Sequence, residues 1–332
     1  MQKAHTLRQR IQYASEHSCF IRVAASASTD ARHHSNAKST TLDAAQPRND
    51  SQTRRLNLPS KSKLGQNFLR DPAAIERIVA ALGPLAHHTV VEIGPGRGAI
   101  TESLARRAER LLAIEVDPVL AAALRDRFAA KHPHVEIVAQ DVLTFDFVAA
   151  ARRVGQSLLV VGNLPYYITS PILMHLAAST LTQGTAVLDS AVLMVQSEVA
   201  DRVTAAPGTR DYGLLSVLCA LHGTATPLFT LPPEAFFPAP KVHSTVFRWN
   251  FAPRFAALSL EPLGFTALLR AAFAQKRKTL SNNLRAAGYS PGRVIHALAA
   301  ASVPPQARAE QLSLDHFAAL HHAIVKARDV QA

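Results

Sequence analysis

The stretch VVEIGPGRG, residues 90–98, decides the fold class of this chain. Four strand-forming residues run directly into a loop in which three glycines alternate with Pro95 and Arg97. Glycine allows the backbone to turn sharply and to approach a ligand closely. In open α/β sheets, ligands bind at the carboxyl ends of strands, where such loops begin. The segment therefore predicts a ligand-binding strand–loop–helix unit, with an ordinary tight turn as the alternative.

The spacing of the glycines narrows the class of ligand. Dinucleotide-binding loops follow the pattern GxGxxG, whereas here the pattern is GxGxG and position 99 is Ala. Together with a carboxylate two residues before the first glycine, this spacing favours an adenosyl cofactor without a pyrophosphate. The candidate cofactor residues in this segment are Glu92, Gly94 and Gly96.

Apolar segments of strand length alternate with helical stretches around this loop. The predicted strands are residues 89–93, 110–116, 135–139, 158–162 and 191–195, and the predicted helices are residues 71–82, 100–107, 118–130 and 172–181. Such alternation predicts βαβ units and a mostly parallel, doubly wound sheet. Two further strands, at 224–231 and 242–249, are joined only by a Pro-rich link and predict an antiparallel hairpin at one edge.

The chain changes character after Pro253. Four helices are predicted there, at residues 262–274, 277–287, 291–300 and 313–327, with Ser313 as the N-cap of the last one. We therefore predict an α/β domain at residues 61–252 and a small all-α domain at residues 253–332.

Composition and charge exclude several classes of protein. The 332 residues are 48% hydrophobic, which excludes wholesale disorder, and no apolar run reaches the ~18 residues of a membrane span. Two cysteines form neither a disulfide framework nor a cysteine zinc site, and no other spacing suggests a metal. The net charge of +12 favours a polyanionic partner, most simply nucleic acid.

Residues 1–60 differ from the rest of the chain. They contain nine Lys or Arg and four Asp or Glu, many small polar residues and little hydrophobic periodicity. We expect a disordered extension, either from a start codon placed too far upstream or, less in keeping with its acidic residues, from a targeting peptide. Without an apolar core for a secretory signal, the expected location is the cytoplasm.

Acidic residues follow the second and third predicted strands. Glu115 and Asp117 end the second strand, and a carboxylate at this place accepts hydrogen bonds from ribose hydroxyls. Because Asp117 precedes Pro118, we assign the helix cap to Asp117 and the ribose to Glu115. Asp141, followed by Val142, ends the third strand, where it would accept from an adenine amino group or cap a turn.

The most specific segment is GNLPYY, residues 162–167, after the fourth strand. An exocyclic adenine amine is a poor nucleophile because its lone pair is delocalised into the ring. Two acceptors, the side-chain oxygen of Asn163 and the carbonyl of Leu164, would localise that lone pair toward a methyl donor. Pro165 stiffens the turn and Tyr166 offers a ring for an extruded base. A β-turn with buried aromatics is the alternative.

At this point the chain resembles the small-subunit ribosomal RNA adenine N6-dimethyltransferases, over about residues 61–327. Besides the segments above, the matching motifs are KLGQNFL at 63–69, LMVQSEVADR at 193–202, DYGLLS at 211–216, FFPAPKVHS at 236–244 and FAQKRKTL at 273–280. The resemblance implies a Rossmann-like methyltransferase sheet with a helical C-terminal domain. It also implies S-adenosylmethionine as cofactor and two adjacent adenosines near the 3′ end of 16S rRNA as substrate, within an assembling small subunit.

The resemblance adds candidate residues at three places. Gln66, Asn67 and Leu69 would border the cofactor, and Phe236 would face the target adenine opposite Tyr166. A basic set would contact RNA phosphates: Lys241, Lys276, Arg277, Lys278 and Arg285. For any one of the last four cations, a solvated helix face is nearly as good an explanation. We expect a monomer.

Three other functions remain open. A resistance methyltransferase acting on large-subunit rRNA shares the Asn-Leu-Pro-Tyr segment, and residues 273–284 favour the small-subunit type. A DNA adenine methyltransferase would usually carry Asp/Asn-Pro-Pro-Tyr/Phe at 163–166. An assembly or mitochondrial transcription factor that kept only the fold is disfavoured by the intact set of candidate residues.

Overall fold

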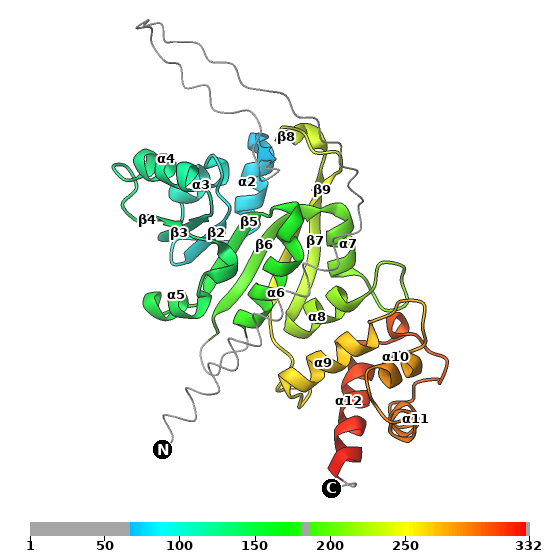
Figure 1. The fold of residues 1–332 in the computed structure, drawn as a ribbon. Helices are drawn as coiled ribbons and strands as arrows, with labels where there is room; N and C mark the ends of the chain where they lie inside the picture. Colours follow the sequence, from blue (N-terminus) through cyan, green and yellow to red (C-terminus); the bar gives the residue numbers. More distant parts are fainter. Residues whose placement is uncertain (1–66, 181–185, 330–332) are drawn as a thin grey trace, which may run out of the picture. The chain divides into compact units, whose positions relative to one another are not determined.

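Seven strands form one sheet in the order β4-β3-β2-β5-β6-β9-β7 (Figure 1). The computed structural model describes residues 67–180 and 186–329, so the predicted extension at 1–60 lies outside the described residues. The strands are β2 Thr89–Ile93, β3 Arg110–Glu115, β4 Val135–Ala139, β5 Leu158–Asn163, β6 Leu188–Gln196, β7 Gly223–Leu231 and β9 Ser244–Phe251. Strands β2 to β6 pair in parallel, and β9 lies antiparallel to both β6 and β7. The predicted fold class is confirmed.

Helices cover both faces of this sheet. The helices are α2 Pro72–Ala80, α3 Ala99–Ala105, α4 Pro118–Phe128, α5 Phe147–Val154, α6 Thr169–Ser179, α7 Ser197–Thr204 and α8 Leu214–His222. Successive residues of a strand point to opposite faces. On β2, Val91 and Ile93 pack in the core with α5 to α8, and Val90 packs with α2 to α4. Burial on both faces explains why β2 is almost continuously apolar.

The Asp-Pro pairs begin helices as predicted. The Asp71 carboxylate accepts hydrogen bonds from the amides of Ala73 and Ala74 at the start of α2. Asp117 does the same for Val119 and Leu120 at the start of α4. In both helices Pro occupies the first position, where no backbone amide donor is needed.

Three kinds of element were not predicted. Helices α5 and α7, of eight residues each, were not predicted from the sequence pattern. A separate two-stranded ribbon pairs β1 Phe68–Leu69 with β8 Phe236–Phe237. Short 3-10 turns complete the connections: η1 Val142–Thr144, η2 Tyr166–Ile168, η3 Pro233–Ala235 and η4 Ala309–Gln311.

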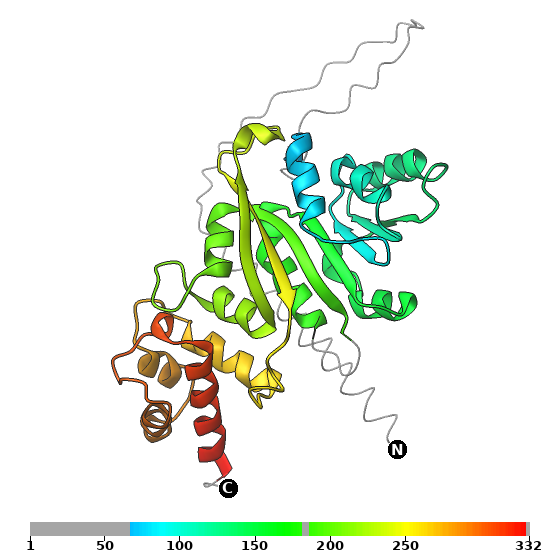
Figure 2. The same ribbon diagram turned by 180° about the vertical axis from the view of Figure 1, so that it is seen from behind.

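All the regular elements described after β9 are helices. The α-helices are α9 Pro262–Ala272, α10 Leu280–Ala286, α11 Pro291–Ala300 and α12 Leu314–Asp329, coloured yellow to red in Figure 2. Their buried side chains share one core with Val217, Leu218 and Leu221 of α8, whose other face belongs to the core of the sheet. The division of the chain at residues 252 and 253 stays a prediction.

The predicted helix at 277–287 begins three residues late. Residues 275–278 form a turn closed by the amide of Lys278, which donates to the carbonyl of Gln275 at 3.0 Å. Thr279 then caps α10 by accepting from the amide of Asn282. Arg277 and Lys278 therefore lie on a turn, and the capping hydroxyl of Thr279 explains where the helix starts. None of the described helices is long and apolar enough to cross a membrane.

Candidate active site

The glycine loop after β2 is covered by the ring of Phe68. Gly94, Gly96 and Gly98 all have positive φ angles, of 67°, 57° and 81°. A Cβ atom on Gly96 would lie 2.9 Å from Cε1 of Phe68, closer than real side chains approach. Position 96 therefore requires glycine both for its backbone conformation and for the contact with β1.

Glu115 joins the loops that follow β2 and β3. One carboxylate oxygen accepts from the amide of Gly96 and the other from the amide of Asp117, both at 3.0 Å. Burial raises the pKa of Glu115, and these two amides act against the increase. Each oxygen keeps a lone pair for another donor, so the ribose hydroxyls predicted for Glu115 fit the site.

Glu92 is the most deeply buried carboxyl group of the candidate site. It is 1% exposed and accepts a hydrogen bond from the Thr101 hydroxyl of α3 at 2.7 Å. Burial is the main cause that raises its pKa to about 7, and the nearby Glu115 carboxylate adds to the increase. A cationic group of a ligand above the glycine loop would favour the ionised form.

Asp141 takes the capping position that was one of its two predicted roles. One of its oxygens accepts from the amide of Leu143 at 2.9 Å, at the start of η1, and the residue is exposed. Val142 is buried beside it. A carboxylate has a second oxygen, so the cap leaves an acceptor for an adenine amino group.

Asn163 ends β5 with its side-chain amide held in one orientation. Its Nδ2 donates to the backbone carbonyl of Asn67 at 2.9 Å. A carbonyl only accepts, so the bond directs the nitrogen toward Asn67 and leaves Oδ1 as an acceptor. Among the residues that the structure describes, no group donates to this Oδ1 or to the Leu164 carbonyl. The two predicted acceptors are therefore adjacent, and neither has a donor within the described part of the chain.

The peptide after Asn163 is also fixed from the sheet. The amide of Leu164 donates to the carbonyl of Met194 on β6 at 3.0 Å, and the whole residue Leu164, backbone included, is 1% exposed. The backbone of the residue before Asn163, Gly162, passes so close to β2 that a Cβ would lie 2.8 Å from the Ile93 carbonyl. Neighbouring strands thus set the position of the Asn-Leu acceptor pair.

Tyr166 and Tyr167 have different environments. Tyr166 is half-buried, and its hydroxyl shares a hydrogen bond of 2.8 Å with Ser244 of β9, which orients the ring. Tyr167 is 57% exposed. Partial burial and the Asp141 and Glu115 carboxylates raise the pKa of Tyr167.

Phe236 does not present its ring to solvent. It is 3% exposed, lies opposite Leu69 in the β1–β8 ribbon and packs with α2 and the sheet. Phe237, the next residue, is 53% exposed. Because successive residues of a strand face opposite sides, the two rings lie on opposite faces of the ribbon, and only the face of Phe236 is covered. The stacking role given to Phe236 stays a prediction that its burial disfavours.

The remaining predicted residues divide into two groups. Asn67 and Leu69 flank Phe68, whose ring covers Gly96 of the glycine loop, whereas Gln66 lies outside the described residues. The basic candidates follow all the other candidate residues in the sequence, and all are exposed: Lys241, Lys276, Arg277, Lys278 and Arg285. Lys276 donates to the Arg210 carbonyl at 3.1 Å. A pocket of about 510 Å³ is lined by residues 275–278.

Two exposed side chains next to predicted site residues were not singled out from the sequence. Val116 is 51% exposed directly after Glu115, where an aliphatic side chain would cover the flat face of a nucleobase. Tyr167 is the other, as described above. An apolar residue that follows a strand-ending carboxylate is a usable signal for Val116, but the exposure of Tyr167 depends on the turn η2.

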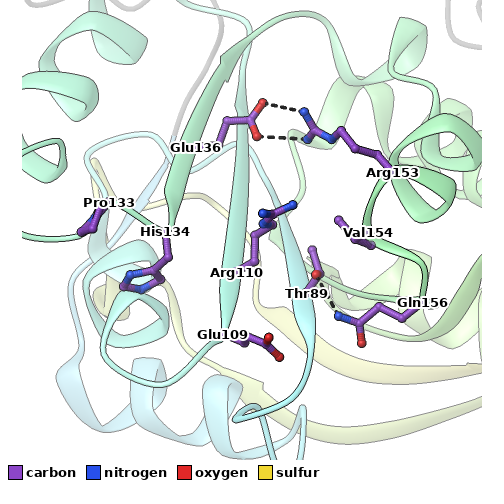
Figure 3. Close-up of a pocket in the computed structure, with 9 residues that line it drawn as sticks. All are labelled: Thr89, Glu109, Arg110, Pro133, His134, Glu136, Arg153, Val154 and Gln156. Atoms are coloured by element: carbon purple, nitrogen blue, oxygen red, sulfur yellow. Dashed lines mark hydrogen bonds and ion pairs between the residues drawn. The ribbon is translucent and has the colours of Figure 1, made fainter.

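A second cavity, of about 550 Å³, lies where β2 and β3 begin, away from the carboxyl ends of the strands that carry the candidate site (Figure 3). It contains the ion pair between Arg153 and Glu136 and the hydrogen bond from Gln156 to Thr89. Thr89 begins β2, five residues before the glycine loop, which corresponds to about 16 Å of strand. None of the predicted site residues lines this cavity.

The buried Glu92 leads to a prediction about stability. Its folded-state pKa of about 7 exceeds the ordinary 4.5, so the folded protein retains this proton up to a higher pH than the unfolded chain. The resulting stabilisation is complete below pH 4.5 and is lost as the pH rises through 7. Glu92→Gln stays neutral and should avoid this loss. Relative to the variant, the cofactor-free wild type should lose about 2 kcal/mol of unfolding free energy between pH 5.5 and 8.5.

Urea denaturation at the two pH values measures this difference. Glu198→Gln, on the exposed first turn of α7, is the matched control and should follow the wild type. Equal pH dependence for the wild type and Glu92→Gln would contradict the assignment of a neutral Glu92.

Comparisons with known proteins agree on one family. The family model of ribosomal RNA adenine dimethylases matches residues 57–326. Proteins named "Ribosomal RNA small subunit methyltransferase A" are similar. The one from Acidobacterium capsulatum is 56% identical over 260 residues, 78% of this chain and 89% of that protein. The one from Koribacter versatilis is 47% identical over 277 residues, 80% and 95% of the two chains.

Solved structures agree with this result. The 23S rRNA methyltransferase ErmE shares 28% identity, with a TM-score of 0.57 over 78% of this chain and 100% of its own. A dimethyladenosine transferase from Plasmodium falciparum, at 22% identity, has the same fold, with a TM-score of 0.64 over 78% and 98% of the two chains. The chain therefore belongs to the ribosomal RNA adenine dimethylase family.

Proposed function

We propose that this protein dimethylates N6 of two adjacent adenosines in the 3′-terminal hairpin loop of 16S rRNA, on the assembling small subunit. As a member of its family it is an S-adenosylmethionine-dependent rRNA adenine dimethyltransferase. The choice of the small-subunit RNA rests on the names of its relatives. The observation that carries the proposal is the orientation of Asn163, whose bond to Asn67 leaves its side-chain amide oxygen as an acceptor.

The residues at the carboxyl edge of the sheet fit S-adenosylmethionine. Gly94 and Gly96 would allow the methionine part to approach the backbone, with Glu92 below it. Glu115 retains lone pairs for the ribose hydroxyls, and Asp141 retains one oxygen for the adenine amino group. Asn67, Leu69, Val142 and Asn163 would complete the walls. Bound there, the cofactor supplies an electrophilic methyl group on a sulfonium.

The chain's own groups would activate the target amine by position. Oδ1 of Asn163 and the Leu164 carbonyl accept the two amine hydrogens and so direct the nitrogen lone pair toward the methyl group. Pro165 restrains the turn, and Tyr166, oriented by Ser244, stacks on the adenine. The amine proton becomes acidic only after methyl transfer, so water suffices as its acceptor. Catalysis then depends on orientation and on preorganised dipoles.

A second substrate is possible for the same chemistry. The structure of the 23S rRNA methyltransferase ErmE is similar to this chain over most of its length. A large-subunit adenosine is therefore the alternative target. We further propose that the protein acts as a monomer in the cytoplasm, where bacterial ribosomes assemble.

Mapping the product distinguishes these possibilities. The purified protein should be incubated with labelled S-adenosylmethionine and small subunits that lack the two dimethyladenosines, with large subunits in parallel. We expect dimethyladenosine in the 3′-terminal hairpin loop of 16S rRNA, identified by mass spectrometry of nuclease fragments. Label confined to 23S rRNA would overturn the small-subunit proposal.

Asn163→Ala should lower the methylation rate constant by ~10²-fold or more, because the reacting amine then lacks one oriented acceptor. The cofactor dissociation constant should change little, since other residues hold most of the cofactor. Single-turnover kinetics and calorimetry measure the two quantities. Asn250→Ala, on the exposed far end of β9, is the control. Wild-type turnover by Asn163→Ala would refute the mechanism.

The basic turn should contribute to RNA affinity. Replacing Lys276, Arg277 and Lys278 with Ala should weaken RNA binding. The slope of log K, the RNA association constant, against log salt concentration should become shallower by about 0.7–0.9 for each RNA phosphate that these cations neutralise. The matched control replaces three other exposed cations with Ala: Arg106 after α3, Arg110 at the start of β3 and Lys131 after α4. Filter binding at several salt concentrations gives the slopes. Equal slopes for both variants would place the RNA on another face.

A further inference from the structure

The β1–β8 ribbon sorts its side chains onto two faces. Phe68 pairs with Phe237, and Leu69 pairs with Phe236. Directly opposite residues of an antiparallel pair point to the same face. Leu69 and Phe236 are buried at 5% and 3% exposure, so their face is the inner one. Phe68 and Phe237 therefore share the outer face.

Two guanidinium groups accompany these outer rings. Cζ of Arg70 lies 5.2 Å from the ring centre of Phe237, and Cζ of Arg97 lies 4.7 Å from that of Phe68. The amide of Arg70 donates to the Ala235 carbonyl at 2.8 Å, which continues the ribbon, and Arg70 is two residues from Phe68 on the same face. We call Arg97, Phe68, Phe237 and Arg70 the outer row.

The outer row lies next to the proposed amine site. Asn67, whose carbonyl holds Asn163, directly precedes Phe68. Cross-strand neighbours have Cα atoms about 5 Å apart, and consecutive Cα atoms are about 4 Å apart. The backbone of Phe237 is thus within about 10 Å of the backbone that orients Asn163. The ring of Phe68 also covers Gly96 of the glycine loop.

The chemistry of the outer row matches unpaired RNA. Phe237 and Tyr167 are the two aromatic side chains among the exposed large apolar residues of the described part of the chain. An exposed ring with a guanidinium over its face combines a stacking surface for a base with a cation for a phosphate. A partner protein with an apolar surface would bury both guanidinium groups without a counter-charge, which is unfavourable. The chain's net charge of +12 instead favours a polyanionic partner.

We propose that the outer row binds an unpaired nucleotide that neighbours the target adenosine. Its base stacks on Phe237 and its phosphate lies at Arg70. The inference rests on the proposed function and deepens it, because it names where the loop outside the reacting base is held. Phe237 would meet this neighbouring nucleotide, separately from the target adenine for which the Phe236 ring is predicted.

Substitutions at Phe237 test stacking separately from size. The variants are Phe237→Ala, Phe237→Leu and Phe237→Tyr, and Ile295→Ala, 67% exposed on α11, is the control for removal of an exposed apolar side chain. The direct readout is the dissociation constant for small subunits that lack the two dimethyladenosines. Loss of one stacked base corresponds to about a tenfold or larger increase. We expect it for Ala and Leu but not for Tyr or the control.

The cofactor dissociation constant identifies a merely structural effect. It should stay at the wild-type value in all Phe237 variants, because the ring that covers Gly96 of the glycine loop belongs to Phe68. Arg70→Ala should weaken RNA binding and flatten its salt dependence, and Arg70→Lys should restore the slope. Wild-type RNA affinity in Phe237→Ala, or equal affinity in the Leu and Tyr variants, would overturn the inference.

Failure of this inference and failure of the proposed function are distinguishable. If the wild type does not methylate 16S rRNA, the proposed function fails, whereas the binding measurements still test the outer row. If the wild type methylates 16S rRNA and Phe237→Ala binds it equally well, only the outer row is refuted.

Discussion

The candidate site depends on the two hydrogen bonds that the buried Glu115 carboxylate accepts from backbone amides. The two carboxylate oxygens accept from the amides of Gly96 and Asp117, in loops that follow different strands. Parallel strands place these loops at one edge of the sheet but do not set the distance between them. The carboxylate does so, and the glycine loop it holds is the surface against which the Phe68 ring packs. Phe68 in turn directly follows Asn67, whose carbonyl orients Asn163.

Two pairs of consecutive aromatic residues, Tyr166–Tyr167 and Phe236–Phe237, lie in the segments predicted to meet the substrate. In each pair one ring is more deeply buried than the other. Tyr166 is tied to Ser244 and Phe236 packs in the core, whereas Tyr167 and Phe237 remain exposed. For the phenylalanines the cause is the alternation of an extended strand. Burial of one ring anchors the segment, and the same geometry forces its neighbour outward, where it is free to meet a ligand.

Much of the fold was predictable because periodicity and capping are local signals. Strands at 89–93 and 135–139 were predicted with their observed bounds, and Asp71 and Asp117 cap helices as expected. The ribbon of β1 and β8 was not predictable in this way, since each strand has two residues and the pairing joins position 69 to position 236. The start of α10 was misplaced because the Thr279 cap competes with an apparently continuous helical pattern.

By itself the sequence determined the class of sheet, the glycine loop, the order of the acidic strand ends and the Asn-Leu-Pro-Tyr segment. Each is written in consecutive residues, so spacing alone reveals it. Only the tertiary structure decided that Asn163 donates to Asn67, that Glu115 joins two loops, and that Phe237 rather than Phe236 is exposed. The first two properties join groups 96 and 19 positions apart in the chain, and the third depends on the pairing of residues 68–69 with residues 236–237. Local residue preferences carry no information about such pairings, because the same preferences are compatible with many packings.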